Sequence, residues 1–137
     1  MIDKININNQ KISLENVSFE RLGRPSAQPK AIINDEILDF SLIGNKISFK
    51  YKRILEVIPS SIYKVSVLFS YESEIITESI ELLKANNQFT KEYLESRAAK
   101  MVESTSLCAV ASQIISNLTA INGNRPFISP PVFIKKS

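Results

Sequence analysis

A regular alternation of apolar and polar residues in the first half of the sequence constrains the fold more than any other feature. It is cleanest over residues 63–71, where the odd positions are apolar and the even positions are mostly polar. The apolar residues of this stretch are Tyr63, Val65, Val67, Phe69 and Tyr71. Successive side chains of a β-strand point to opposite faces, so this period of two predicts a strand with one buried face.

Three further segments show the same period. The first runs from residue 2 to residue 21, and its phase shifts between Ile7 and Ile12, which indicates a bulge near residues 8–10. A loop with one glycine and two prolines follows at 22–29. The next strands are expected at about 35–42 and 47–58, joined by the tight turn Gly44-Asn45. Four consecutive strands linked by turns predict an antiparallel β-meander over about residues 2–73.

The rest of the chain changes character. Residues 90–122 carry apolar residues at spacings of three and four, which predicts helix. The serines and threonine at 104–106 leave open whether this is one kinked helix or two shorter ones, and residues 76–84 fit either strand or helix. The tail, residues 125–134, holds three prolines and is expected to be extended and irregular. The fold class is therefore α+β, a four-stranded meander with a long C-terminal helix on one face.

Length and composition fit one soluble domain over residues 1–137. The chain is 44% hydrophobic and 23% charged, as in ordinary globular domains. It has no run of ~20 apolar residues that could span a membrane, and its first residues do not resemble a secretory signal. The one cysteine, Cys108, cannot form an internal disulfide, which favours a cytoplasmic location. Its apolar surroundings predict a buried, unreactive thiol.

The residue inventory argues against catalysis and against cofactors. The sequence has no histidine and one cysteine, so neither a common general base nor a zinc or iron–sulfur site is expected. Its three glycines are isolated, and no phosphate-binding loop or nucleophile motif is present. The net charge is +3, and basic residues gather at Lys46, Lys50, Lys52 and Arg53, but this cluster is interpreted as one solvated strand face. We therefore expect no nucleic-acid partner.

Two segments resemble the SecB family of protein-export chaperones. Asn16-Val-Ser-Phe-Glu20 is similar to the family's first-strand motif, which a proline-containing loop follows. Residues 114–134, ending Asn-Gly-Asn-Arg-Pro-Phe-Ile-Ser-Pro-Pro-Val-Phe-Ile, are similar to its helix end, glycine turn and proline-rich segment. The order of several strands before a long helix also matches.

The resemblance implies a cytoplasmic, ATP-independent holdase that keeps unfolded polypeptides in hydrophobic grooves for export. It also implies a homotetramer built as a dimer of dimers. An alternative is a dedicated interaction module, such as an antitoxin-specific SecB-like chaperone or an assembly adaptor. The family uses acidic residues of the sheet to bind the SecA motor, and Glu20 matches one such position. Asn16 and Ser66 stand where acids are expected, which argues against SecA as a partner more than against chaperone activity.

The sequence suggests two sets of contact residues. Client-groove candidates are the large apolar residues of the strands and tail, which could equally be ordinary core: Val17, Phe19, Leu22, Phe40, Leu42, Phe127, Val132 and Phe133. A helix that packs on one sheet needs a single apolar stripe. The predicted helix carries more apolar residues than one stripe holds, and these extra residues predict a contact with the same helix of another subunit. The residues expected at that contact are Leu107, Ala111, Ile115 and Leu118. Ile114 and Ile115 could exchange roles.

Overall fold

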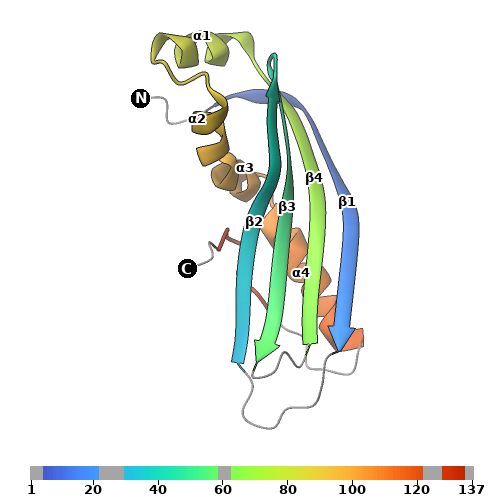
Figure 1. Ribbon diagram of the computed structural model, residues 1–137. Helices are drawn as coiled ribbons and strands as arrows, with labels where there is room; N and C mark the ends of the chain where they lie inside the picture. The colour runs from blue at the N-terminus through green and yellow to red at the C-terminus, as the bar shows by residue number, and fades with distance from the viewer. Residues whose placement is uncertain (1–4, 22–29, 59–62, 122–127, 135–137) are drawn as a thin grey trace.

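The computed structural model describes residues 5–21, 30–58, 63–121 and 128–134 (Figure 1). Within these residues lie four strands, β1 (Ile7–Arg21), β2 (Lys30–Ile43), β3 (Lys46–Ile58) and β4 (Tyr63–Ile75). Four helices follow, α1 (Thr77–Ala85), α2 (Lys91–Ser96), α3 (Ala98–Ser104) and α4 (Leu107–Ile121). The α+β class and the antiparallel four-stranded sheet are confirmed.

The order of the strands corrects the predicted meander. The sheet order is β1-β4-β3-β2, and all three pairings are antiparallel. Strands β2, β3 and β4 do form a meander, but β1 pairs with β4 instead of β2. The reason is that alternation of apolar residues fixes which face a strand buries and leaves its neighbour undetermined. The result places β1 and β2 at the two edges of the sheet.

The predicted irregularities are present, and register shifts between Leu14 and Asn16 and between Leu38 and Ser41 occur that the sequence does not predict. The pairing of β1 with β4 shifts register between Asn8 and Lys11, and Asn9 adopts a positive φ of 49°. The expected bulge is therefore confirmed. A two-residue turn joins β2 to β3, with Gly44 at φ +63° in its first position. Glycine is favoured there because it has no Cβ to clash in the left-handed region.

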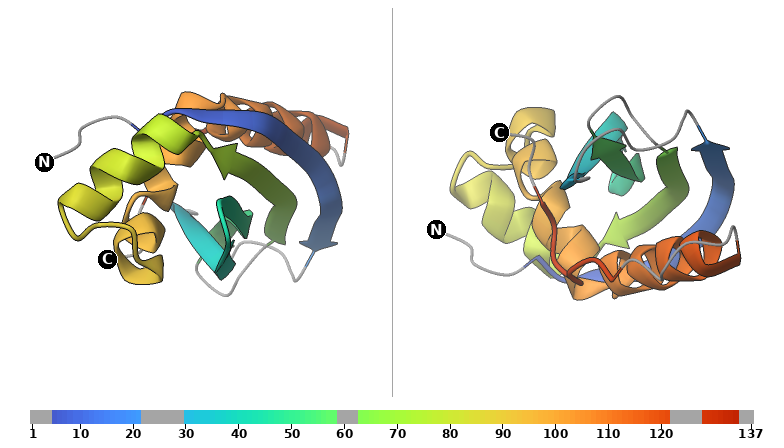
Figure 2. Two further views of the ribbon diagram at one scale, coloured as in Figure 1. Left: turned by 90° about the horizontal axis from the view of Figure 1, so that it is seen from above. Right: turned by 90° about the horizontal axis from the view of Figure 1, so that it is seen from below.

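The helices cover one face of the curved sheet, and Figure 2 shows α4 running along that face. Every odd-numbered residue of β4 is buried, and every even-numbered one is partly exposed. The core that forms between sheet and helices is continuous from α1 to α4. Its largest fully buried apolar side chains are Tyr51, Tyr71, Ile47, Leu55, Ile75, Leu83, Leu94, Ile115, Val65, Val67 and Val102. The predicted helix on one sheet face is thus confirmed.

Residues 77–121 form several short helices. Residues 76–84, left open by the sequence, fall mainly in α1, which buries Ser79 and Leu83 one turn apart. The break expected at 104–106 is present, because Ser106 has a φ of 65° between α3 and α4. A further break at Arg97 separates α2 from α3. The predicted end of the helix at residue 122 lies outside the described residues.

A buried ion pair joins β2 to β3. Asp35 and Arg53 are cross-strand partners whose side chains are fully buried. Arg53 donates from Nε to Oδ1 of Asp35 and from Nη2 to Oδ2, both at 2.8 Å. The Tyr51 hydroxyl donates to Oδ1 at 3.0 Å. A bidentate pair of this kind is strong and directional because both hydrogen bonds are charge-assisted.

The same pair holds the tail segment, which we define as residues 128–134. Arg53 donates to the carbonyl oxygens of Pro130 at 2.7 Å and Val132 at 2.6 Å. The amide of Ile134 donates to Oδ2 of Asp35 at 2.8 Å, and the amide of Asp35 donates to the carbonyl of Ile134 at 2.7 Å. The segment is irregular, with neither helix nor strand and a bend at residues 131–132, as the prolines predict.

The three groove candidates of the tail differ in their surroundings. The Phe133 ring lies 6.0 Å from that of Tyr51 between centroids and packs against the core. The Val132 side chain is half exposed, and its carbonyl makes the contact with Arg53. Phe127 lies outside the described residues.

The turn between β2 and β3 gives a first prediction. A Cβ at Gly44 would meet no heavy atom within 4 Å, so substitution costs backbone strain alone. We expect Gly44→Ala to lower the free energy of unfolding by about 1–2 kcal/mol. Gly44→Asn should lower it less, because asparagine tolerates the left-handed region. Urea denaturation measures both, and equal losses in the two variants would contradict this explanation.

The ion pair gives a second prediction. Arg53→Met leaves the Asp35 carboxylate buried without its counter-ion and should lower the free energy of unfolding by about 3–5 kcal/mol. The double variant Arg53→Met/Asp35→Leu removes both charges, so it should recover a large part of that loss. Chemical denaturation of the three proteins tests this. A single variant as stable as the natural chain would disprove the role given to the pair.

Candidate functional site

The structure places the predicted groove residues in different environments. Phe40 is buried and stacks on Phe49 at 5.9 Å between ring centroids, and Leu42 packs against the same core. These two residues therefore belong to the core of the chain. Phe19 stacks on Tyr63 at 5.4 Å, and both Phe19 and Val17 are only partly buried. Leu22 lies outside the described residues.

The residues expected at a helix contact between subunits need correction. Leu107, Ala111 and Ile115 are buried within the chain, with Ala111 and Ile115 fully inaccessible. They form the stripe by which α4 packs on the sheet, so Ile115 lies on the inner side and not on an outer stripe. Ile114 is partly buried beside it, as is Leu118. Of the two isoleucines whose roles the sequence left open, Ile115 is the one that packs on the sheet, and Ile114 is partly buried.

An apolar surface remains uncovered between β1 and α4. Ile12 and Leu14 pair with Tyr71 and Phe69, whose side chains face the helices, yet they are 39% and 50% exposed. On α4, Val110 is 45% exposed. We call Ile12, Leu14 and Val110 the β1–α4 surface. Partly buried apolar residues of the two elements lie behind it, namely Val17, Phe19, Ile114 and Leu118.

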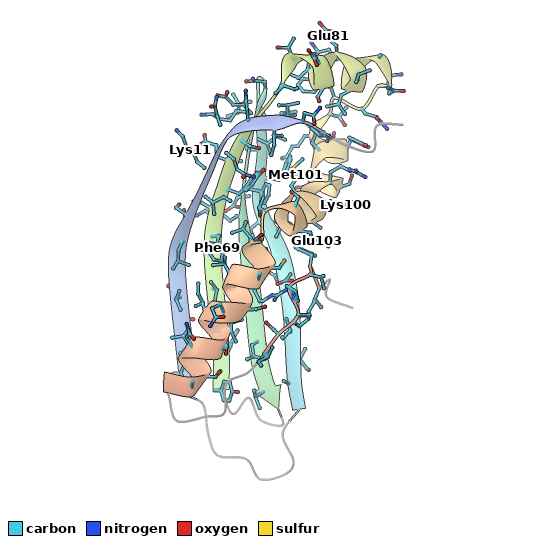
Figure 3. The ribbon with its side chains drawn as sticks, turned by 180° about the vertical axis from the view of Figure 1, so that it is seen from behind. Lys11, Phe69, Glu81, Lys100, Met101 and Glu103 are labelled. Atoms are coloured by element: carbon cyan, nitrogen blue, oxygen red, sulfur yellow. The ribbon has the colours of Figure 1, made fainter. Side chains whose placement is uncertain are left out.

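Two flanks of α4 can be distinguished, one toward β1 and one toward the tail. Residues three and four apart share one helix face, so Val110, Ile114 and Leu118 form a stripe. Ser112 lies on the other flank, where its hydroxyl donates to the Ser129 carbonyl of the tail at 2.9 Å. The tail lies toward β2 because Ile134 bonds Asp35. Figure 3 shows α4 running beside β1 on the opposite side.

The outer edge of β1 adds main-chain groups to this region. β1 is the first strand of the sheet order, and among the described residues it pairs with β4 alone. An edge strand presents N–H and C=O groups that can pair with another extended chain. Near its beginning, a groove of about 420 Å³ lies between Ile5, Ile7 and Met101, with Arg97 and Lys100 in its lining. Figure 3 shows Lys100 and Met101 on α3.

The opposite face of the sheet is polar and balanced in charge. Lys50 bonds Glu15 at 3.0 Å, and Lys46 bonds Glu72 at 2.7 Å. The bond to Glu72 raises the pKa of Lys46, and the same bond lowers the pKa of Glu72. Glu20, the predicted partner-binding acid, is exposed and stands opposite Lys64 in the register. This face therefore lacks the excess of acid that a basic partner would need.

The described residues offer little for covalent or metal chemistry. Burial raises the pKa values of the Tyr51 hydroxyl and the Cys108 thiol, so both groups stay protonated near neutral pH. The prediction of a buried Cys108 is confirmed. In the part of the chain that the structure covers, no three His, Cys, Asp or Glu side chains gather as metal ligands would. No helix in that part has the length and apolar character needed to cross a membrane.

Sequence reasoning missed the Asp35–Arg53 pair. It treated Arg53 as part of a basic cluster with Lys50 and Lys52. The overlooked signal is the phase: Arg53 falls on the odd positions that are otherwise apolar in β3, and Asp35 does the same in β2. Two opposite charges on buried positions of neighbouring strands indicate a buried pair.

Comparison with known proteins rests on structure. No protein-family model matches the sequence, and no curated protein matches it. The SecB-like chaperone Rv1957 of Mycobacterium tuberculosis, solved in complex with a ChAD peptide from the Rv1956 HigA1 antitoxin, matches with a TM-score of 0.64 and 12% identity. The match covers 91% of this chain and 87% of that chain.

A protein of unknown function from Streptococcus agalactiae matches with a TM-score of 0.40 and 12% identity. That match covers 93% of this chain and 98% of the other, and a score at this level supports no conclusion. The similarity to Rv1957 extends over the sheet and the helices that follow it, which is the architecture described above. The chain has the fold of a SecB-like chaperone.

Proposed function

We propose that this protein is an ATP-independent holdase of the cytoplasm that binds unfolded polypeptides. The observation that carries the proposal is the β1–α4 surface in a SecB-like fold: Ile12, Leu14 and Val110 expose apolar side chains beside a strand edge. Large apolar side chains left exposed in one region mark interaction sites in soluble proteins. The sequence has no phosphate-binding loop, which supports a mechanism without nucleotide.

The chemistry of this region suits extended clients. Apolar side chains of an unfolded segment gain free energy by leaving water, about 1.5–3 kcal/mol for a large side chain that becomes fully buried. The free edge of β1 can bond main-chain groups regardless of sequence. Arg97 and Lys100, in the groove near the start of β1, favour acidic residues beside the apolar ones. Together these features support broad binding of unfolded chains.

Assembly is part of the proposal. A second copy of the chain could cover the helix side of this region through Val110 and the partly buried Leu118, which leaves Ile12 and Leu14 on β1 open to a client. Repetition of such contacts would give the expected homotetramer, a dimer of dimers. Closed symmetric assemblies are the usual way in which proteins bury such surfaces. Sedimentation equilibrium at tens of micromolar measures the mass, and a monomer at that concentration would contradict the assembly.

A dedicated partner is the second candidate. The specific observation that favours it is that Rv1957 was solved with a peptide of an antitoxin. A chain specialised in this way would bind one partner tightly and protect unrelated unfolded proteins poorly. SecA is left out of the proposal, because the outer sheet face balances its charges and Glu20 faces Lys64 in the register.

Suppression of aggregation tests the holdase. A reduced, alkylated protein that cannot refold serves as client, and light scattering follows its aggregation. We expect protection at an equimolar ratio of client to chain. Leu14→Glu charges the β1–α4 surface and should raise the concentration needed for half protection about tenfold, the equivalent of 1.4 kcal/mol.

Ile43→Glu is the matched control. Ile43 is 75% exposed at the far end of β2, so the same change of charge occurs away from the proposed surface. Its protection should equal that of the natural chain. No protection by the natural chain, or equal protection by both variants, would refute the proposal. Protection of a single partner but no unrelated client would favour the dedicated chaperone.

A further inference from the structure

The tail segment is bound to the rest of the chain as a peptide ligand would be. Its four shortest contacts with the Asp35–Arg53 pair use main-chain atoms, namely the carbonyls of Pro130, Val132 and Ile134 and the amide of Ile134. All four distances lie between 2.6 and 2.8 Å. Main-chain groups are common to every polypeptide, so these contacts do not depend on the sequence that makes them.

The groups that bind the tail come from three elements far apart in the sequence. Asp35 is on β2 and Arg53 on β3, and Ser112 of α4 contributes hydrogen bonds to Ser129. The guanidinium also bonds the Ser112 hydroxyl at 2.8 Å. Each of these side chains is held by the others, so the site is organised by the fold and not by the tail alone.

Two side chains of the tail are held in the site. Phe133 packs on Tyr51, and the buried Ser129 hydroxyl accepts from Arg53 at 3.2 Å and lies 2.8 Å from that of Ser112. Val132 is half exposed and Ile128 is 83% exposed. A site that takes one aromatic side chain, one small polar side chain and main-chain carbonyls can accept many sequences. The tail itself has neither helix nor strand over its described length, with a bend at residues 131–132.

We propose that the site under the tail segment is a second client-binding channel, which the tail occupies when no client is present. An extended client segment replaces the tail, its carbonyls accept from Arg53, and an aromatic side chain takes the place of Phe133 on Tyr51. The proposal rests on the holdase function and adds a site on the flank of α4 away from the β1–α4 surface. A long unfolded chain that contacts both sites gains affinity through multivalency.

Competition explains how such a channel is regulated. A segment tethered to its site acts at a millimolar effective concentration, so weak or folded proteins do not displace it. The channel therefore opens for clients that already bind elsewhere on the chain. It also keeps the buried pair covered between clients, because the tail carbonyls satisfy donors of Arg53 that would otherwise be left without acceptors.

The test measures binding of a fluorescein-labelled synthetic peptide of residues 128–137 to full-length chains by anisotropy. Phe133→Ala weakens the internal tail and should bind the peptide about tenfold more tightly than the natural chain, the equivalent of 1.4 kcal/mol. Val132→Ala is the matched control. It removes an exposed side chain next in sequence and should bind the peptide as the natural chain does.

Client competition completes the experiment. The reduced, alkylated client should displace the peptide from the Phe133→Ala chain. It should also speed hydrogen exchange at the Ile134 amide of the natural chain, since that amide bonds Asp35 only while the tail is docked. Equal peptide affinity in the two variants would overturn the channel. So would a client that binds without displacing the peptide or exposing the amide.

The same experiments distinguish a failure of the holdase proposal from a failure of the channel proposal. If the client neither binds nor is protected from aggregation while Phe133→Ala still binds the peptide tightly, the site under the tail is a peptide channel in a protein that is not a general holdase. Urea denaturation of both variants shows whether either has lost its fold. The peptide affinity of the folded Val132→Ala chain is then the reference for that of Phe133→Ala.

Discussion

The ion pair of Asp35 and Arg53 is the constraint on which the rest of the structure depends. Each charge lies on the buried face of a strand, where an unpaired ion would be strongly destabilising. Arginine suits the position because its planar guanidinium donates in several directions at once. It reaches the carboxylate, the Ser112 hydroxyl and two tail carbonyls. One residue thereby fixes β2, β3, α4 and the tail relative to one another.

Helix α4 divides the layer above the sheet into two regions of different chemistry. Its inner stripe, with Ala111 and Ile115, is buried on the sheet. One flank is apolar and leads to β1, and the other carries Ser112 and leads to the tail. A surface made of side chains and a tail held largely by main-chain bonds therefore lie on either side of one helix. Both kinds of contact suit polypeptides that have no fold of their own.

The sequence predicted those features that local periodicity controls. The alternation in β4 and the glycine turn at Gly44 follow from the geometry of a strand and of a tight turn, and both are found. The place of β1 beside β4 does not follow, because the same alternation fits either edge of the meander. The inner position of Ile115 depends on how α4 is rotated over the sheet. Arg53 was misread because a charge on a buried position has meaning only with its cross-strand partner.

The pairing of β1 with β4 also has a consequence for how the chain reaches its fold. Ile7 stands opposite Ile75, so the first strand acquires its neighbour only after the last strand has been synthesised. Contacts between residues so distant in sequence slow folding, because a long loop must close before the contact stabilises it. Until then β1 carries Ile12, Leu14 and Phe19 with no strand beside them. A protein that we propose to hold unfolded chains thus passes through a stage in which its own first strand resembles one.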